Sequence, residues 1–224
     1  RRVKLAGLDL RFGASTAITS VLLMAPLCAW MVVLMLGVLL ERGVERARAV
    51  WLAFLFAFAT PVFYRSAHLN HNVFLMAVLF GAFLLLWKRG GGPTSVSRRA
   101  WAGFLCGMAI SLDYAGVVPA SVLALYFVVT RAREASLRAA LRECAAPVFA
   151  ALPPILFLLG TQWAMYGNAF TPGQFVMPDQ NEFVGEGKRG MGWPSLEILV
   201  KNLISPSWGL LPFAPLLVIA FWPA

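Results

Sequence analysis

The stretch "GMAISLDYAGVVP", residues 107–119, places one carboxylate, Asp113, in the middle of an apolar run. Between Arg99 and Arg131 no other residue carries a formal charge. The run 100–130 is too long for one straight helix across about 30 Å of hydrocarbon and too short for two helices of about 20 residues each. We therefore expect two short helices, 100–112 and 114–130, that meet at Asp113 and form a broken membrane hairpin.

The composition indicates the solvent in which this hairpin folds. Hydrophobic residues make up 60% of the chain and charged residues only 13%, about half the charged share of soluble domains, and the mean hydropathy is +0.75. We expect an all-α polytopic membrane protein that forms a single transmembrane domain over residues 1–224, with about six to seven membrane helices including the short broken hairpin. The remaining apolar segments are 15–40, 49–64, 72–87, 144–165 and 208–222.

The basic residues predict the orientation. Loops 41–48, 88–99 and 131–143 are rich in Arg and Lys, and the positive-inside rule places them in the cytoplasm. The net charge of +9 thus reflects topology, and no nucleic-acid partner is expected. The links 65–71 and 166–207 then face outward. The second is a long extracytoplasmic loop, in which 193–204 has the pattern of an amphipathic helix at the membrane surface.

The outer link in "TPVFYRSAHLNHN", residues 60–72, gathers Arg65, His68, Asn70 and His71. A cationic, hydrogen-bonding face of this kind suits a phosphate or pyrophosphate group. Two histidines without a third ligand make an incomplete zinc site, so no residue is assigned as a metal ligand. An ordinary interfacial loop is the alternative.

Asp113 and Tyr114 are the second group of candidate substrate-binding residues. An acid within a membrane segment is a functional-site hypothesis by default, because its burial is costly. At the tip of a hairpin it would face an aqueous cavity that opens to the outside. The alternative is structural: Asp113 caps the second helix, and Tyr114 begins it.

Four segments in this order resemble bacterial members of the GT-C superfamily, which are integral-membrane glycosyltransferases similar to protein O-mannosyltransferases and the aminoarabinose transferases of lipid A. The resemblance implies a polyprenyl-phosphate-linked sugar donor and a lipid, glycan or protein acceptor, with membrane lipid around them. It also implies an active face outside the bacterial inner membrane. No cofactor is assigned, and a divalent metal is left open. The segments are "TPVFYRSAHLNHN" (60–72), "AGFLCGMAISLDYAGVVPASVLALY" (102–126), "YGNAFTPGQF" (166–175) and "ISPSWGLLPFAPLL" (204–217).

The resemblance leaves the catalytic residue unknown. In the family the catalytic acid lies in the first outer loop, and this chain is expected to be a fragment that begins downstream of that loop. Asp113 would instead position the acceptor or pair with Arg65. A membrane transporter and a non-catalytic lipid-binding scaffold are the alternative functions. A transporter usually shows internal repeats, and none is seen here.

Overall fold

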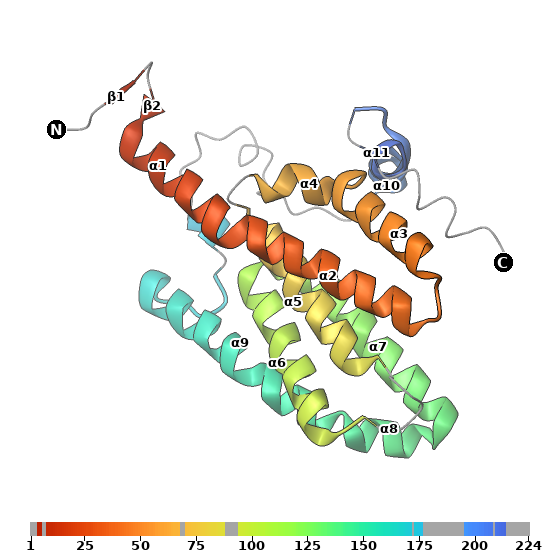
Figure 1. The fold of residues 1–224 in the computed structure, drawn as a ribbon. Helices are drawn as coiled ribbons and strands as arrows, with labels where there is room; N and C mark the ends of the chain where they lie inside the picture. Colours follow the sequence, from red (N-terminus) through yellow and green to blue (C-terminus); the bar gives the residue numbers. More distant parts are fainter. Residues whose placement is uncertain are drawn as a thin grey trace. The chain divides into compact units, whose positions relative to one another are not determined.

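The computed structural model describes residues 4–5, 8–67, 70–87, 94–171, 173–176, 195–207 and 209–213 (Figure 1). The expected helical fold is confirmed; one antiparallel pair of two-residue strands, β1 (Lys4–Leu5) and β2 (Leu8–Asp9), is an addition to it.

The chain divides into two compact units: unit 1 contains residues 1–58 and 62–157, and unit 2 contains 59–61 and 158–224. The helices are α1 (Leu10–Thr19), α2 (Ala25–Glu41), α3 (Arg46–Phe58), α4 (Pro61–Ser66), α5 (His71–Leu86), α6 (Val96–Leu112), α7 (Val117–Glu134), α8 (Leu137–Glu143), α9 (Ala145–Tyr166), α10 (Leu196–Ile204) and α11 (Leu210–Phe213), with a π-helical turn at Ser20–Met24 and 3-10 turns at Tyr114–Gly116 and Gly173–Val176.

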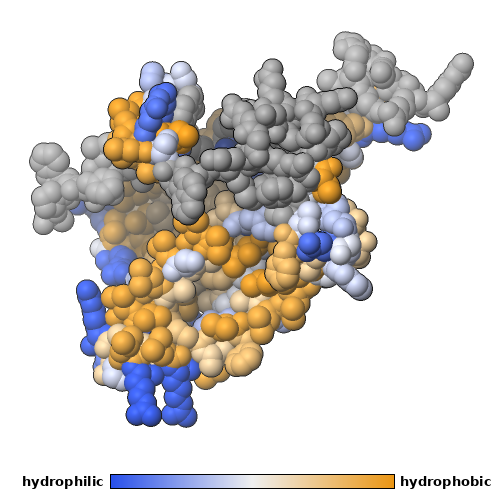
Figure 2. All heavy atoms as spheres, turned by 180° about the vertical axis from the view of Figure 1, so that it is seen from behind, coloured by the Kyte–Doolittle hydropathy of each residue, from blue (hydrophilic) through white to orange (hydrophobic). Residues whose placement is uncertain are grey.

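Three helical stretches among the described residues are long and apolar enough to cross a membrane: Leu10–Glu41, Tyr114–Glu134 and Leu137–Tyr166. The shorter helix His71–Leu86 is also apolar. Large apolar side chains on these stretches are exposed, including Trp30, Val122 and Phe149. Figure 2 shows hydrophobic residues spread over the face that it presents. Side chains of this kind face lipid without penalty, so the chain is an integral membrane protein.

The helix break lies at Asp113, as the sequence predicts. The backbone of Asp113 is extended, its N–H donates to the carbonyl of Ala109, and its Oδ1 accepts from the N–H of Ala115 at 2.9 Å. These bonds satisfy polar backbone groups that water would otherwise have to satisfy. The carboxylate therefore ends α6 and begins the helical turn that leads into α7.

Both helices of the hairpin are longer than the sequence predicts. Ser95 caps α6 by accepting from the N–H of Arg98, so residues 96–99 are helical instead of belonging to a loop. Likewise, the predicted loop 131–143 contains the end of α7 and all of α8, which Ser136 caps. At 1.5 Å per residue, the 17 residues of α6 span about 26 Å, close to the thickness of the hydrocarbon layer.

Helices α6 and α9 approach so closely that their contact requires small residues. Gly103, Gly107 and Ser111 follow one another at four-residue spacing, so they share a face of α6. A Cβ at Gly103 would overlap the backbone of Pro147, and the Ser111 hydroxyl donates to the carbonyl of Pro154 at 2.8 Å. Small residues allow this backbone-to-backbone packing in membrane helices.

The basic loops meet at one end of unit 1, which we call the basic end. The guanidinium of Arg42 lies 4.4 Å from the centroid of the Trp87 ring, and both residues line a pocket with Thr94 and Arg131. Because α5 and α6 run in opposite directions from this end, the first residue of α5 and the last residue of α6 share the other end. His71 and Asp113 lie there.

We predict that Gly103→Ala lowers the stability of unit 1, whereas Gly37→Ala raises it. A Cβ at Gly103 meets the backbone of Pro147, and such overpacking costs about 1–3 kcal/mol. A Cβ at Gly37 in α2 meets nothing within 4 Å, so it should add up to about 1 kcal/mol of helix propensity. Thermal unfolding of both variants in detergent measures this difference. Equal stability of the two would contradict the close α6–α9 packing.

Candidate functional site

His71 and Asp113 form a polar pair at the end of unit 1 opposite the basic end. The Nε2 atom of His71 lies 3.1 Å from Oδ2 of Asp113, although 42 positions separate the residues in the chain. The His71 side chain is 58% exposed and that of Asp113 29% exposed. The pair is therefore partly shielded and still accessible to a ligand.

The two oxygens of Asp113 have different tasks. Oδ1 caps the turn after α6 by accepting from Ala115, and Oδ2 faces the imidazole of His71. An ionised carboxylate has about four lone-pair sites, so it keeps acceptor capacity after both contacts. The structural and the functional interpretations of this acid are thus compatible.

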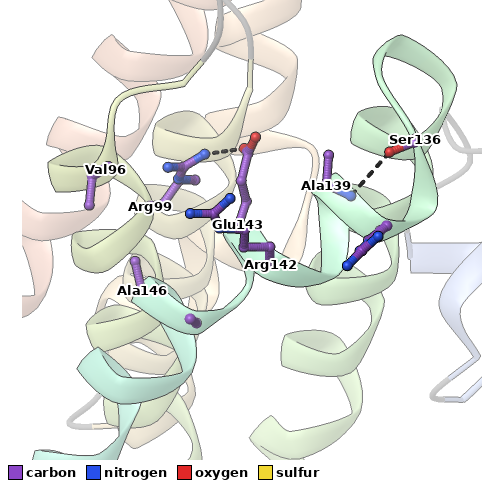
Figure 3. A pocket seen from close by; sticks show the side chains of 9 residues that line it. Val96, Arg99, Ser136, Ala139, Arg142, Glu143 and Ala146 are labelled. Carbon is purple, nitrogen blue, oxygen red and sulfur yellow. Dashed lines mark hydrogen bonds and ion pairs between the residues drawn. The ribbon is translucent and has the colours of Figure 1, made fainter.

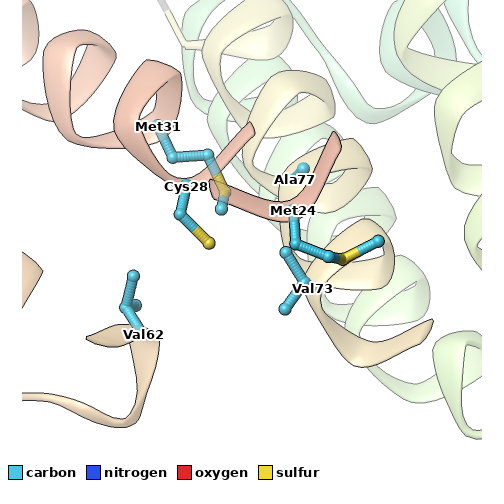
Figure 4. Packing of buried hydrophobic residues seen from close by; sticks show 6 residues of the cluster. All are labelled: Met24, Cys28, Met31, Val62, Val73 and Ala77. Atoms are coloured by element: carbon cyan, nitrogen blue, oxygen red, sulfur yellow. The ribbon is translucent and has the colours of Figure 1, made fainter. Parts of the chain in front are cut away.

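His71 is held in place from both sides along the chain. Asn70 precedes α5, and its Oδ1 accepts from the N–H of Asn72 at 2.9 Å, which fixes the first turn of the helix. Val73 then belongs to a buried cluster that joins α2, α4 and α5 (Figure 4). The imidazole therefore projects from a capped and packed helix start.

The other candidates occupy different places. Arg65 is exposed on α4, and among the described residues no ion pair joins it to Asp113; the partner of the acid is His71. The contact that the structure gives Asp113 is thus with another residue of the segment 60–72, His71. Tyr114 is at the surface beside Asp113, 37% exposed. His68 lies outside the described residues.

An apolar groove begins beside the polar pair. It has a volume of about 650 Å³ and runs between α5 and α7. Its lining includes Asn72, which directly follows His71, and Val118, which lies two residues after the turn Tyr114–Gly116. The groove continues along Leu79 and Phe80 of α5 and Val122 of α7. The candidate site thus combines a hydrogen-bonding end, the His71–Asp113 pair, with a long apolar surface.

The groove and the His71–Asp113 contact are the features that sequence reasoning missed. Residues 72–87 and 114–130 read only as apolar helices, and nothing in their pattern tells which of their faces are adjacent. The available signal was that two helices, α5 and α6, lie between the two candidate groups. If these helices are antiparallel neighbours, the residue at the start of α5 meets the residue at the end of α6.

The outer segment is described in part. Helix α10 occupies the predicted amphipathic stretch from Leu196 to Ile204, with Ser195 as its cap. Trp163 and Phe170 are exposed within unit 2. Over the parts of the chain that the structure describes, no three His, Cys, Asp or Glu side chains gather in a way that could hold a metal ion.

We predict that Asp113→Ala destabilises the protein more than Asp113→Asn does. Alanine removes the cap on the turn after α6, at a cost of about 0.5–2 kcal/mol, whereas the asparagine Oδ1 still accepts from Ala115. The contact with His71 is part-exposed and adds little to stability. Unfolding midpoints of the two variants test this. If asparagine and alanine are equally damaging, the cap does not hold the hairpin.

The model of a protein family described as glycosyltransferase family 87 matches residues 5–222. Neither a curated protein nor a solved structure gives a significant match to the chain.

Proposed function

The chain belongs to glycosyltransferase family 87, a GT-C-type family of membrane glycosyltransferases, and from this membership we propose the substrates and the face of the reaction. The donor is a sugar linked to polyprenyl phosphate. The acceptor is a hydroxyl of a lipid, glycan or protein. Transfer takes place at the extracytoplasmic face of the bacterial inner membrane.

One observation carries this proposal: the polar His71–Asp113 pair lies at the start of the apolar groove between α5 and α7. A lipid-linked sugar is amphiphilic in the same sense, with a polar head and a long hydrocarbon chain. The groove offers the hydrocarbon chain of the donor an apolar surface that is open from the side. The His71–Asp113 pair offers hydrogen-bonding partners to the polar head. A soluble nucleotide-sugar has no hydrocarbon chain that could occupy the groove.

The His71–Asp113 pair suits hydroxyl groups, either those of the donor's sugar or that of the acceptor. Asp113 retains free lone pairs that accept from sugar hydroxyls. The Nε2 atom of His71 faces Asp113, which leaves Nδ1 for a ligand. We assign these residues to binding and positioning, together with Asn70 as the residue that holds the start of α5. Arg65 on α4 and His68 are candidates for the donor phosphate, because positive charge stabilises a phosphate leaving group.

The topology supports an outward-facing site. The basic end, with Arg42 and Arg131, belongs in the cytoplasm by the positive-inside rule. Helices α5 and α6 then also cross the membrane, α3 with α4 makes another crossing and α11 begins the last. Together with the three long spans, this gives about seven crossings. His71 and Asp113 reach the outer headgroup layer, and the segment 166–207 with α10 lies outside.

We predict that Asp113→Asn and His71→Gln each reduce transfer about 10- to 100-fold in kcat/KM, because each removes a hydrogen bond to a charged or strongly polar ligand group. The measurement is transfer of labelled sugar from a polyprenyl-phosphate donor in membranes that contain the protein. Glu45→Gln is the matched control, since Glu45 is an exposed acid in the link between α2 and α3. Unchanged transfer by both site variants, at wild-type stability, would remove the pair from the site.

The groove is tested separately by Val118→Trp. This exposed residue lines the groove, so an indole there should raise the KM for a long-chain polyprenyl donor much more than for a short-chain analogue. Leu125→Trp is the control, because Leu125 is exposed on α7 but does not line the groove. An equal effect of Val118→Trp on both donors would place the hydrocarbon chain elsewhere.

A further inference from the structure

A second pocket lies at the basic end of unit 1, where α6, α8 and α9 come together (Figure 3). Its volume is about 990 Å³. Its polar lining comes from Arg99 of α6, from Arg138, Arg142 and Glu143 of α8, and from Ser136 before α8. The proposed transfer reaction uses none of these side chains.

The pocket carries an excess of positive charge. Its one carboxylate, Glu143, is bound by Arg99 and also by Arg131, whose Nη2 lies 2.8 Å from Oε1 of Glu143. Glu143 is therefore neutralised by arginines that hold α6, α7 and α8 together. Among the described residues, Arg138 and Arg142 have no ion pair, so their charges are available to a ligand in the pocket.

Arg99 adds a buried positive charge to the same pocket. Its side chain is only 10% exposed, and its Nε is buried without a hydrogen-bond partner. Buried donors of this kind are nearly always satisfied in folded proteins. Because this Nε is closed off from solvent, the Arg99 side chain contributes its positive charge to the pocket that it lines, while its Nη1 holds Glu143.

The surroundings of the pocket indicate which kind of molecule carries the anion. On α8, Arg138 and Arg142 are one turn apart, and beside them Leu137 and Leu141 are also one turn apart and exposed. Phe149, early in α9, is exposed as well. Leucines and a phenylalanine next to arginines suit the boundary between acyl chains and headgroups, whereas a free phosphate would need no apolar rim.

We propose that this pocket binds the headgroup phosphate of an anionic phospholipid. Arg138 and Arg142 contact the phosphate, the buried Arg99 adds positive charge to the pocket wall, and Leu137 and Leu141 lie against the acyl chains. Arginine forks match phosphate oxygens well, and basic pockets at the cytoplasmic ends of membrane helices bind such lipids. The lipid thereby ties α8 to the ends of α6 and α9. This inference is independent of the proposed sugar donor.

The test is native mass spectrometry of the purified protein with added phosphatidylglycerol, with phosphatidylcholine as the neutral lipid and inorganic phosphate as the competitor. No sugar donor is present, so the result does not depend on transfer activity. Wild-type protein should retain phosphatidylglycerol in preference to phosphatidylcholine, and millimolar phosphate should not displace it. The variant R138Q/R142Q should weaken phosphatidylglycerol binding about 25-fold, at about five-fold per arginine.

The matched control is R46Q/R133Q, which removes two exposed arginines outside the pocket and changes the net charge equally. It should bind phosphatidylglycerol like the wild type. A thermal melt of each variant excludes loss of fold. Equal phosphatidylglycerol binding by R138Q/R142Q and R46Q/R133Q overturns the proposal, as does displacement of the lipid by inorganic phosphate.

Discussion

The structure depends on how the backbone is satisfied where α6 ends. A break between two helices of a membrane domain leaves backbone N–H and C=O groups without their helical partners, and these groups must be satisfied by other polar atoms. Asp113 solves this locally, because its N–H donates to Ala109 and its Oδ1 accepts from Ala115. The same carboxylate still has Oδ2 directed at His71. The residue that allows the hairpin to form thus also creates the polar pair at its tip.

The two ends of unit 1 differ in their chemistry for related reasons. At one end, capped helix starts and a single acid–imidazole pair border an apolar groove. At the other, arginines from several helices surround Glu143 and leave an excess of positive charge. Between the ends, the close contact of Gly103 and Gly107 with α9 keeps the helices in register. An amphiphilic substrate and an anionic lipid would then bind at opposite ends without competing.

The sequence predicts the helical membrane class, the break at Asp113 and the gathering of basic loops at one end, because each depends on local charge and hydropathy. It predicts helix ends less well. Residues 96–99 and 137–143 read as loops because they are charged, although Ser95 and Ser136 are recognisable caps. The pairing of Asp113 with His71 follows from the antiparallel placement of α5 and α6, which no local pattern encodes. The family match over residues 5–222 agrees with the GT-C resemblance read from four short segments.

Photo-crosslinking with a polyprenyl-phosphate-sugar analogue that carries a diazirine near the phosphate tests the central claim most directly. If the His71–Asp113 pair binds the polar end of the donor, labelled peptides should come from the start of α5 and from the turn between α6 and α7, and excess natural donor should suppress the labelling. Labelling confined to the basic end, or spread evenly over the lipid-facing helices with or without competitor, would contradict it.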